Sequence, residues 1–254
     1  MHLLITNDDG IYAKGIRALA IALAQTQRHR VTVVAPDRQQ SASSHSITLH
    51  KPLHAKSVAL PHGIEGYAVN GTPADCVKLA LGALCDEHPP DLVVSGVNHG
   101  ANLGMDIVYS GTASAASEAV MHGIPAIAMS LIDEPFDFTA SVHIALGLID
   151  LFNYHKLPHD VYLNVNIPPG SRESLKGIRV TKTGIRKYRN AYEKRVDPLG
   201  RTYYWQAGQV VQIENEPDTD VYQVERGYVS VTPVHLHFTN SEMVDTLKSW
   251  PFQL

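Results

Sequence analysis

The sequence is poor in cysteine, with only Cys76 and Cys85 among its 254 residues. These two lie nine positions apart in one helical pattern, which places them on opposite faces of a helix and excludes a disulfide between them. We expect both thiols to be reduced and buried in the core, as is typical of proteins from reducing compartments.

Long apolar runs and an excess of positive charge are also missing. No stretch of about 18 apolar residues occurs, which argues against a membrane-spanning helix. The chain begins MHLLITND, without a basic segment or a cleavage site, and this predicts a cytoplasmic protein with no signal peptide. The formal net charge of −4 excludes a surface for duplex nucleic acid, but it is compatible with a small anionic substrate.

The residues that are present indicate an α/β protein. Apolar residues make up 44% of the chain, and the first of their short runs, at 3–5, is followed by a polar turn and a helical pattern. Similar strand and helix patterns alternate along the chain. We expect a single Rossmann-like domain over 1–254, with a mostly parallel sheet and helices on both faces. The expected strands are 3–5, 31–35, 91–95, 125–130, 161–167 and 227–234, with short side strands at 47–49, 53–57 and 67–69. The expected helices are 16–24, 73–84, 112–121, 139–152 and 241–250.

Polar residues follow several of these strands. Asp8 and Asp9 come directly after the first strand, Ser41 follows the second, and Asn98 and Asn102 follow the strand at 91–95. Ligands in open α/β sheets bind beyond the carboxyl ends of the strands, so we expect these side chains to meet there. Adjacent carboxylates repel each other, and a bound cation would relieve that repulsion. The competing interpretation is an Asp-Asp-Gly turn whose carboxylates face water.

The types of ligand atom limit which metal ions are expected to bind. Carboxylate, amide and hydroxyl oxygens suit Mg²⁺, Mn²⁺ or Ca²⁺ better than zinc. Ser110, Gly111 and Thr112 open a predicted helix, where free amides, hydroxyls and the helix dipole favour an anion. The competing interpretation there is an ordinary helix cap. A metal and an anion at one sheet edge indicate metal-assisted phosphate chemistry.

The segment 182–226 has no sustained apolar period and carries Tyr188, Tyr192, Tyr203, Tyr204 and Trp205. The turn signal at 197–200 favours a projecting hairpin over a mobile linker. Clustered aromatics on such an arm suggest a partner chain.

Five motifs occur in order at 6–11, 71–77, 95–104, 109–112 and 227–233, and they read TNDDGI, GTPADCV, SGVNHGANLG, YSGT and GYVSVTP. They resemble the SurE family of metal-dependent survival-protein nucleotidases. The resemblance implies a phosphomonoesterase acting on nucleoside 5′- and 3′-monophosphates and on short polyphosphate, with one Mg²⁺ or Mn²⁺ per subunit. It also implies a homodimer or homotetramer that exchanges its C-terminal hairpin and helix.

By the same resemblance the metal ligands are Asp8, Asp9, Ser41 and Asn98, with Asp8 or Asp9 as the catalytic base. The phosphate-binding residues are Asn102, Ser110, Gly111 and Thr112. Two positions depart from the family pattern: Ala42 and Ala119 stand where glycine is usual.

Other functions remain open at this point. A non-catalytic nucleotide- or polyphosphate-binding protein would use the same ligand types. An aspartyl-phosphate phosphatase is disfavoured, because it needs Asp-x-Asp and here the two aspartates are adjacent. His99, beside the predicted metal ligand Asn98, is interpreted as a general acid or as a residue at the rim of the site.

Overall fold

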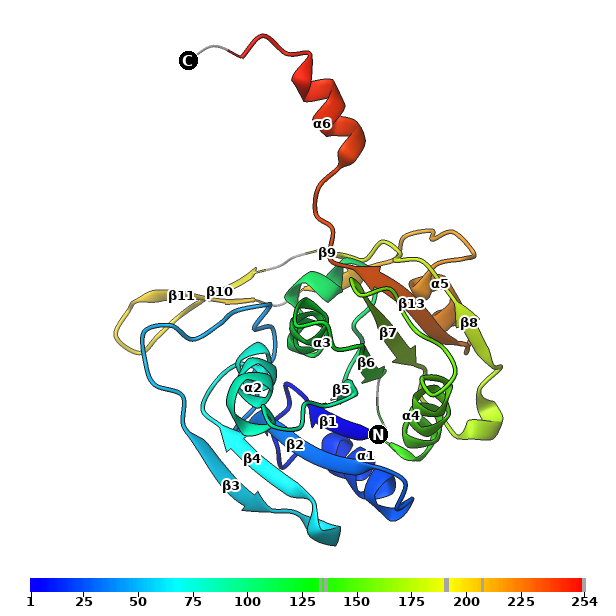
Figure 1. Ribbon diagram of the computed structural model, residues 1–254. Helices are drawn as coiled ribbons and strands as arrows, with labels where there is room; N and C mark the ends of the chain where they lie inside the picture. The colour runs from blue at the N-terminus through cyan, green and yellow to red at the C-terminus, as the bar shows by residue number, and fades with distance from the viewer. Residues whose placement is uncertain (133, 135–136, 190–191, 207, 253–254) are drawn as a thin grey trace.

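A nine-stranded sheet forms the centre of the computed structural model, which describes all residues except 133, 135–136, 190–191, 207, 253 and 254. Its strand order is β3-β4-β2-β1-β5-β6-β7-β13-β8, and the pairs from β4 to β7 are parallel. The predicted mostly parallel α/β fold is confirmed (Figure 1). The strands are β1 (His2–Thr6), β2 (Arg30–Pro36), β3 (Ala55–Ala59), β4 (Glu65–Val69), β5 (Leu92–His99), β6 (Ala126–Leu131), β7 (Val161–Ile167), β8 (Ile178–Val180) and β13 (Val229–His235).

Helices cover both faces of this sheet because the side chains of its strands alternate. Leu3 and Ile5 of β1 pack with α1 (Lys14–Gln25) and α4 (Thr139–Leu151). Leu4 points to the opposite face, toward α2 (Pro73–Leu79) and α3 (Gly111–Met121). None of the helices in the described part of the chain is both long enough and apolar enough to cross a membrane.

The α2 helix shows how local sequence sets an element. Thr72 accepts a hydrogen bond from the backbone of Asp75, whose carboxylate accepts one from the backbone of Thr72, and Pro73 occupies the first helical turn. The helix continues through a wider turn, η2 (Ala80–Leu84), and places Cys76 and Cys85 in the interior as free thiols, as predicted.

Two predictions about strands were wrong. Residues 47–49 form no strand, because the backbone N–H of Thr48 donates to the carboxylate of Asp75 instead of to a neighbouring strand. The edge strand β8 was not predicted, since the apolar–polar alternation of Ile178, Arg179 and Val180 is only three residues long.

The structure divides the segment 182–226. β10 (Tyr192–Val196) and β11 (Thr202–Gln206) form the expected antiparallel hairpin, while β9 (Lys187–Arg189) pairs with β12 (Gln209–Val211) at its base. The end of the segment is instead a helix, α5 (Asp220–Glu225), which packs against β13. The arm is shorter than predicted because the buried carboxylate of Asp220 accepts hydrogen bonds from the backbone of Gly104 and Gly184.

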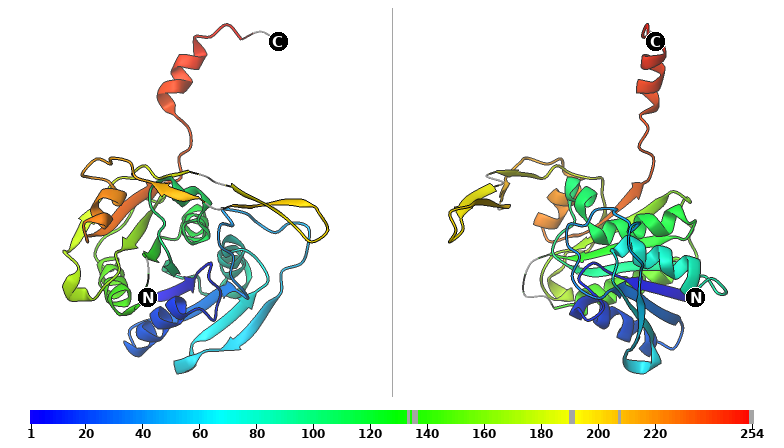
Figure 2. Two further views of the ribbon diagram at one scale, coloured as in Figure 1. Left: turned by 180° about the vertical axis from the view of Figure 1, so that it is seen from behind. Right: turned by 90° about the vertical axis from the view of Figure 1, so that its left-hand side faces the viewer.

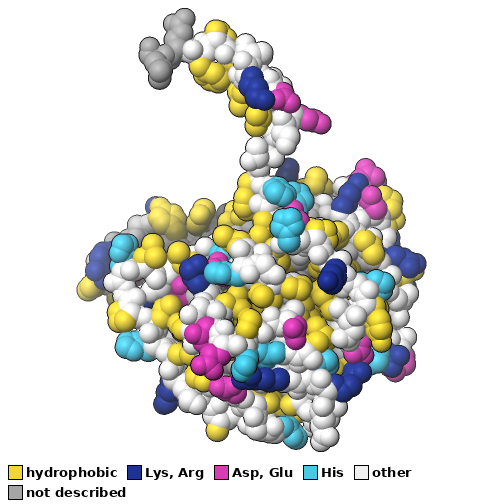
Figure 3. All heavy atoms as spheres, in the orientation of Figure 1, with side chains coloured by type: hydrophobic (Ala, Val, Ile, Leu, Met, Phe, Trp, Pro, Cys, Tyr) yellow, Lys and Arg dark blue, Asp and Glu magenta, His cyan; other side chains and the backbone are white. Residues whose placement is uncertain are grey.

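Two segments leave the body of the molecule. Figure 2 shows the β10–β11 hairpin and α6 (Ser241–Lys248) projecting in different directions. Hydrophobic side chains lie along the projecting C-terminal segment in Figure 3. Phe238, Met243, Val244, Trp250 and Phe252 are exposed there.

Candidate functional site

The loop after β1 carries the two adjacent carboxylates and is held by a side-chain clamp. The carboxamide of Asn7 donates to the carbonyl of Gly10 at 3.0 Å and accepts from its N–H at 3.1 Å. Gly10 has a φ of 97°, and a Cβ there would lie 3.1 Å from the backbone of Arg38. The turn therefore requires glycine, and it fixes the direction in which Asp8 and Asp9 leave the strand.

Asp8 is buried and has no ion pair with a lysine, arginine or histidine of the described chain. Its Oδ1 accepts a hydrogen bond of 2.6 Å from the hydroxyl of Thr112. Burial raises the pKa of Asp8 to about 6; the neighbouring charge of Asp9 adds to this shift, and the Thr112 hydrogen bond opposes it. A buried carboxylate without a cationic side chain fits a site that takes a cation from solution.

Asp9 is joined to the end of β5. Its Oδ2 accepts a 3.0 Å hydrogen bond from the backbone N–H of His99 and lies 3.4 Å from Nδ1 of the same residue. Burial raises the pKa of Asp9, and the His99 contacts act against the increase. The pairing of β1 with β5 brings these residues together across 90 positions of sequence.

Asn98 lies near the end of β5, and Asn102 lies on the loop that follows this strand. The side-chain N–H of Asn98 donates to the carbonyl of Gly100 at 2.9 Å, which leaves its amide oxygen as the atom suited to bind a cation. Asn102 is fixed by its backbone: its N–H donates to Oδ1 of Asn166 at 2.8 Å, and its carbonyl accepts from Nδ2 of the same side chain at 3.0 Å.

The asparagines behind this loop were not identified from the sequence. Asn164 and Asn166 on β7 are fully buried, and both donate to the carbonyl of Asn102. The side chain of Asn102 donates in turn to Ser130 on β6 at 2.7 Å. The sequence feature that could have identified them is the pair of amides at alternate positions of an otherwise apolar strand. A buried polar group needs a hydrogen-bond partner, so this pair indicates a contact with another segment.

The start of α3 approaches Asp8 closely. Ser110 caps the helix through a 3.0 Å hydrogen bond from the N–H of Ala113. A Cβ on Gly111 would lie 2.8 Å from Cβ of Asp8, so only glycine allows this approach. The hydroxyl of Thr112 was expected to face an anion, but it donates to Asp8 because the side chain of this residue points back toward β1.

Ser41 lies on the loop between β2 and β3 and is exposed. Its hydroxyl accepts from the side chain of Gln39 at 2.9 Å. The loop is tied to the site by the N–H of Gln40, which donates to the carbonyl of Asp8 at 2.7 Å, and by the N–H of Ser44, which donates to Tyr109 at 3.0 Å. Ala42, one of the two departures from the family pattern, has a φ of 54°, in the left-handed region that favours glycine.

A buried carboxylate on α3 holds the same loop. The side chain of Glu118 is 3% exposed and has one lysine and two histidine partners, which come from three segments. Nε2 of His45 lies 2.7 Å from its Oε2, while Nζ of Lys78 and Nε2 of His122 lie 3.1 and 3.0 Å from its Oε1. The hydrogen bond from His45 is the largest of the effects that lower the pKa of Glu118 to about 2. Glu118 therefore fastens the Ser41 loop to α2 and α3.

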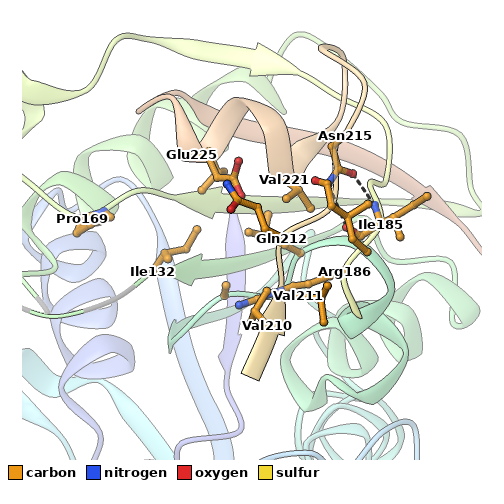
Figure 4. Close-up of a pocket in the computed structure, with 14 residues that line it drawn as sticks. Ile132, Pro169, Ile185, Arg186, Val210, Val211, Gln212, Asn215, Val221 and Glu225 are labelled. Carbon is orange, nitrogen blue, oxygen red and sulfur yellow. Dashed lines mark hydrogen bonds between the residues drawn. The ribbon is translucent and has the colours of Figure 1, made fainter. Parts of the chain in front are cut away.

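Most of the predicted residues line one open hollow of about 640 Å³, namely Asp8, Ser41, Asn98, Asn102 and Ser110. Asp9 lines a neighbouring hollow with Tyr12, Lys14 and Gln39, and His99 borders both. A separate cavity of about 490 Å³ lies between the arm base and α5, among side chains such as Ile132, Val211 and Val221 (Figure 4). Among the described residues that line this cavity there is no aspartate, so the hollow at Asp8 is the candidate site.

The donor set fits a hard cation. Across the described residues no group of three or more His, Cys, Asp or Glu side chains is placed to hold a metal. The candidate ligands are instead two carboxylates, one amide and one hydroxyl, an all-oxygen set of the kind that Mg²⁺ and Mn²⁺ prefer.

Comparisons with known proteins identify the family of the chain. The family model described as Survival protein SurE matches residues 3–190. The chain is 48% identical to a protein named 5′-nucleotidase SurE from Carboxydothermus hydrogenoformans, with 98% of this chain and 96% of the relative covered. It is 49% identical to a protein of the same name from Pelotomaculum thermopropionicum, with 98% and 94% covered. The crystal structure of the SurE protein from Aquifex aeolicus has a TM-score of 0.84 and 42% identity, with 98% of each chain covered.

Proposed function

Because the chain belongs to the SurE family, we propose that it is a metal-dependent phosphomonoesterase that hydrolyses nucleoside 5′-monophosphates. The observation that carries this proposal is the buried carboxylate of Asp8, which has no cationic side chain beside it among the described residues and opens onto a hollow next to the start of α3. Such a position suits a cation and a phosphate ester together.

We propose that one Mg²⁺ or Mn²⁺ ion per subunit is held by Asp8, Asp9, Ser41 and Asn98. When bound, the ion would offset the charge of the phosphoryl oxygens and lower the pKa of a bound water. Thr112 orients Asp8 for this role, and the N–H of His99 orients Asp9. Asp8 or Asp9 is the proposed base, with attack by water as the first mechanism to test and attack by a carboxylate as the second.

The phosphate group is proposed to bind at the start of α3. Gly111 supplies a backbone N–H group in the first turn, and the hydroxyl proton of Ser110 remains available while its oxygen accepts from Ala113. Thr112 stands beside them, with its own N–H and hydroxyl directed toward Asp8. Asn102 borders the same hollow from the opposite loop. Because this hollow is open, we extend the proposal to nucleoside 3′-monophosphates and short polyphosphate.

A phosphate-release assay tests the proposal. With Mg²⁺ or Mn²⁺ the protein should release phosphate from nucleoside 5′-monophosphates, and excess EDTA should stop the release. Full turnover in EDTA would contradict the metal dependence. Binding of nucleotides without release under every metal condition would favour the alternative, a non-catalytic nucleotide- or polyphosphate-binding protein.

We further propose that the active species is a cytoplasmic homodimer or homotetramer held by exchange of the hairpin and α6. The aromatic side chains of Tyr203 and Trp205 are exposed. They lie on the same face of the hairpin, where Tyr203 is opposite Arg195 and Trp205 is opposite Glu193 of β10. The double substitution Tyr203→Ser with Trp205→Ser should lower the particle mass measured by light scattering. Tyr154→Ser, an exposed position on the body, is the control, and an unchanged mass in the double variant would contradict the exchange.

A further inference from the structure

The hollow at Asp8 has a second wall made of aromatic and amide side chains. Tyr109 precedes the cap residue Ser110, whereas Tyr188 and Gln206 come from β9 and β11 at the base of the hairpin. In the described chain, neither lysine nor arginine lines this hollow. The wall is therefore suited to a neutral, flat group and not to a second anion.

Tyr188 is held rigidly at its hydroxyl. That hydroxyl donates to Oδ2 of Asp106 at 2.5 Å, and Nη1 of Arg186 lies 3.0 Å from the same oxygen. Burial and the Asp106 hydrogen bond raise the pKa of Tyr188 to about 12, so the phenol remains a donor at neutral pH. The residue is nevertheless 48% exposed. The guanidinium of Arg186 lies over the ring, 5.7 Å from its centroid. A ring that is fixed at its hydroxyl and still half exposed is pre-organised for stacking on the part that Arg186 leaves uncovered.

Tyr109 is held by its backbone, because its carbonyl accepts a 3.0 Å hydrogen bond from the N–H of Ser44. The residue is 65% exposed and borders the same hollow. Tyr109 immediately precedes Ser110, which caps α3, and both residues line the hollow at Asp8.

We propose that Tyr109 and Tyr188 bind the base of a nucleoside monophosphate by stacking, with the carboxamide of Gln206 at the edge of the base. This inference rests on the proposed function and adds the recognition of the base to it. Stacking on an aromatic ring tolerates every base because each base has a π-face. The site would therefore favour nucleotides over base-free phosphate esters without requiring one particular base.

The neighbouring hollow offers a competing place for the base. It contains another exposed aromatic, Tyr12, but among the proposed metal and phosphate residues only Asp9 lines it. The Tyr188 wall instead shares its hollow with Asp8, Asn98 and Ser110. Substitution of Tyr12 is therefore the matched control for substitution of Tyr109 and Tyr188.

The experiment compares two substrates and one ligand. Phosphate release is measured with adenosine 5′-monophosphate and with ribose 5-phosphate in Mn²⁺, and adenosine binding is measured by equilibrium dialysis. The variants are Tyr109→Ser, Tyr188→Ser, Tyr188→Phe and Tyr12→Ser, with melting curves to confirm that each one folds.

For Tyr109→Ser and Tyr188→Ser, KM for adenosine 5′-monophosphate should rise about 5- to 100-fold, while KM for ribose 5-phosphate changes less than about 2-fold. Adenosine binding should weaken in parallel. Tyr188→Phe keeps the ring and should retain most of the binding, and Tyr12→Ser should behave like the parent protein.

Equal increases in KM for both substrates would overturn the inference, as would a selective loss in Tyr12→Ser. Adenosine binding that is unchanged by loss of both tyrosines would also overturn it. Failure of the proposed function looks different: the parent protein would then release phosphate from neither ester, while dialysis would still show whether the tyrosines bind adenosine.

Discussion

The hydroxyl of Thr112 donates to Oδ1 of Asp8 across 2.6 Å, so the first turn of α3 orients a carboxylate at the end of β1. The two residues are 104 positions apart in the sequence. This hydrogen bond links the proposed phosphate position to the proposed metal position, because Thr112 stands in the first turn of α3 and both its hydroxyl and its backbone N–H act on Asp8.

Thr112→Val should therefore weaken metal binding. The substitution keeps the shape but removes the donor to Asp8, and the loss of a hydrogen bond to a charged group costs roughly 1.5–3 kcal/mol. We expect the dissociation constant for Mn²⁺ in calorimetry to rise about 10- to 100-fold. Thr112→Ser should restore the affinity. An unchanged metal affinity combined with weaker inhibition by phosphate would contradict this role.

The pKa of Asp8 predicts how metal binding depends on pH. The folded protein holds the proton of Asp8 up to about pH 6, against a usual value of 3.8. The metal-free protein should therefore lose stability as pH rises from about 4 to 6, and metal affinity should increase over the same range. Melting curves at pH 5 and pH 7.5 should show a larger Mn²⁺-induced shift at pH 7.5. Asp8→Asn removes one of the two adjacent carboxylates whose pKa is raised and should reduce this difference.

The substitution Asp9→Asn tests whether Asp9 is a metal ligand or a structural residue. In the wild-type protein, Mn²⁺ at about 100 times its dissociation constant should add about 2.7 kcal/mol, or roughly 5–10 °C in Tm. The variant should lose most of this shift and most of the turnover. Its amide oxygen can still accept from the N–H of His99, and one repelling charge is gone, so its metal-free form should melt no lower than the wild type. A metal-free variant several degrees less stable would assign Asp9 a structural role instead.

The two departures from the family pattern should respond oppositely to glycine. Ala42 has a φ of 54°, so Ala42→Gly should relieve strain and raise the free energy of unfolding by about 0.5–1 kcal/mol. Ala119 is fully buried within α3, so Ala119→Gly should lower the free energy of unfolding by about 1 kcal/mol or more. Denaturant titration measures both. A stabilising effect at position 119 or a destabilising one at 42 would contradict the backbone argument.

Glu118→Gln tests the clamp on the Ser41 loop. The neutral amide keeps the size but loses the charge that faces His45, Lys78 and His122, so we expect a loss of roughly 1–3 kcal/mol of stability. Limited proteolysis should cut the loop between β2 and β3 faster. His122→Gln removes one histidine partner that does not belong to this loop, and it should leave the rate of loop cleavage unchanged. Equal rates in parent and Glu118→Gln would mean that the backbone contacts alone hold the loop.

The sequence predicted the sheet well, because its central strands are continuous apolar runs separated by helices of regular period. It also placed Asp8, Asn98 and Ser110 at one edge, since parallel strands bring their carboxyl ends together. The directions of the side chains could not be predicted from the sequence. Nothing in the local pattern indicates that Thr112 points toward Asp8 or that Asn166 binds the backbone of Asn102. Such contacts depend on strand register. The segment 182–226 was interpreted as one arm because α5 has only two buried apolar side chains, Val221 and Val224, within six residues.

The link between Asp9 and His99 spans 90 positions, and it has a consequence for how the chain is made. During synthesis the β1 strand and its two carboxylates leave the ribosome first, while their neighbour β5 is still untranslated. At about 5–20 residues per second, roughly 5–20 s pass before His99 is made. Until then Asp8 and Asp9 are exposed to water beside a strand edge that has no partner. The hollow at Asp8 is complete only after Asn166, which holds the backbone of Asn102, has left the ribosome. Translation that stalls before this point leaves the edge of β1 that pairs with β5 without its partner strand.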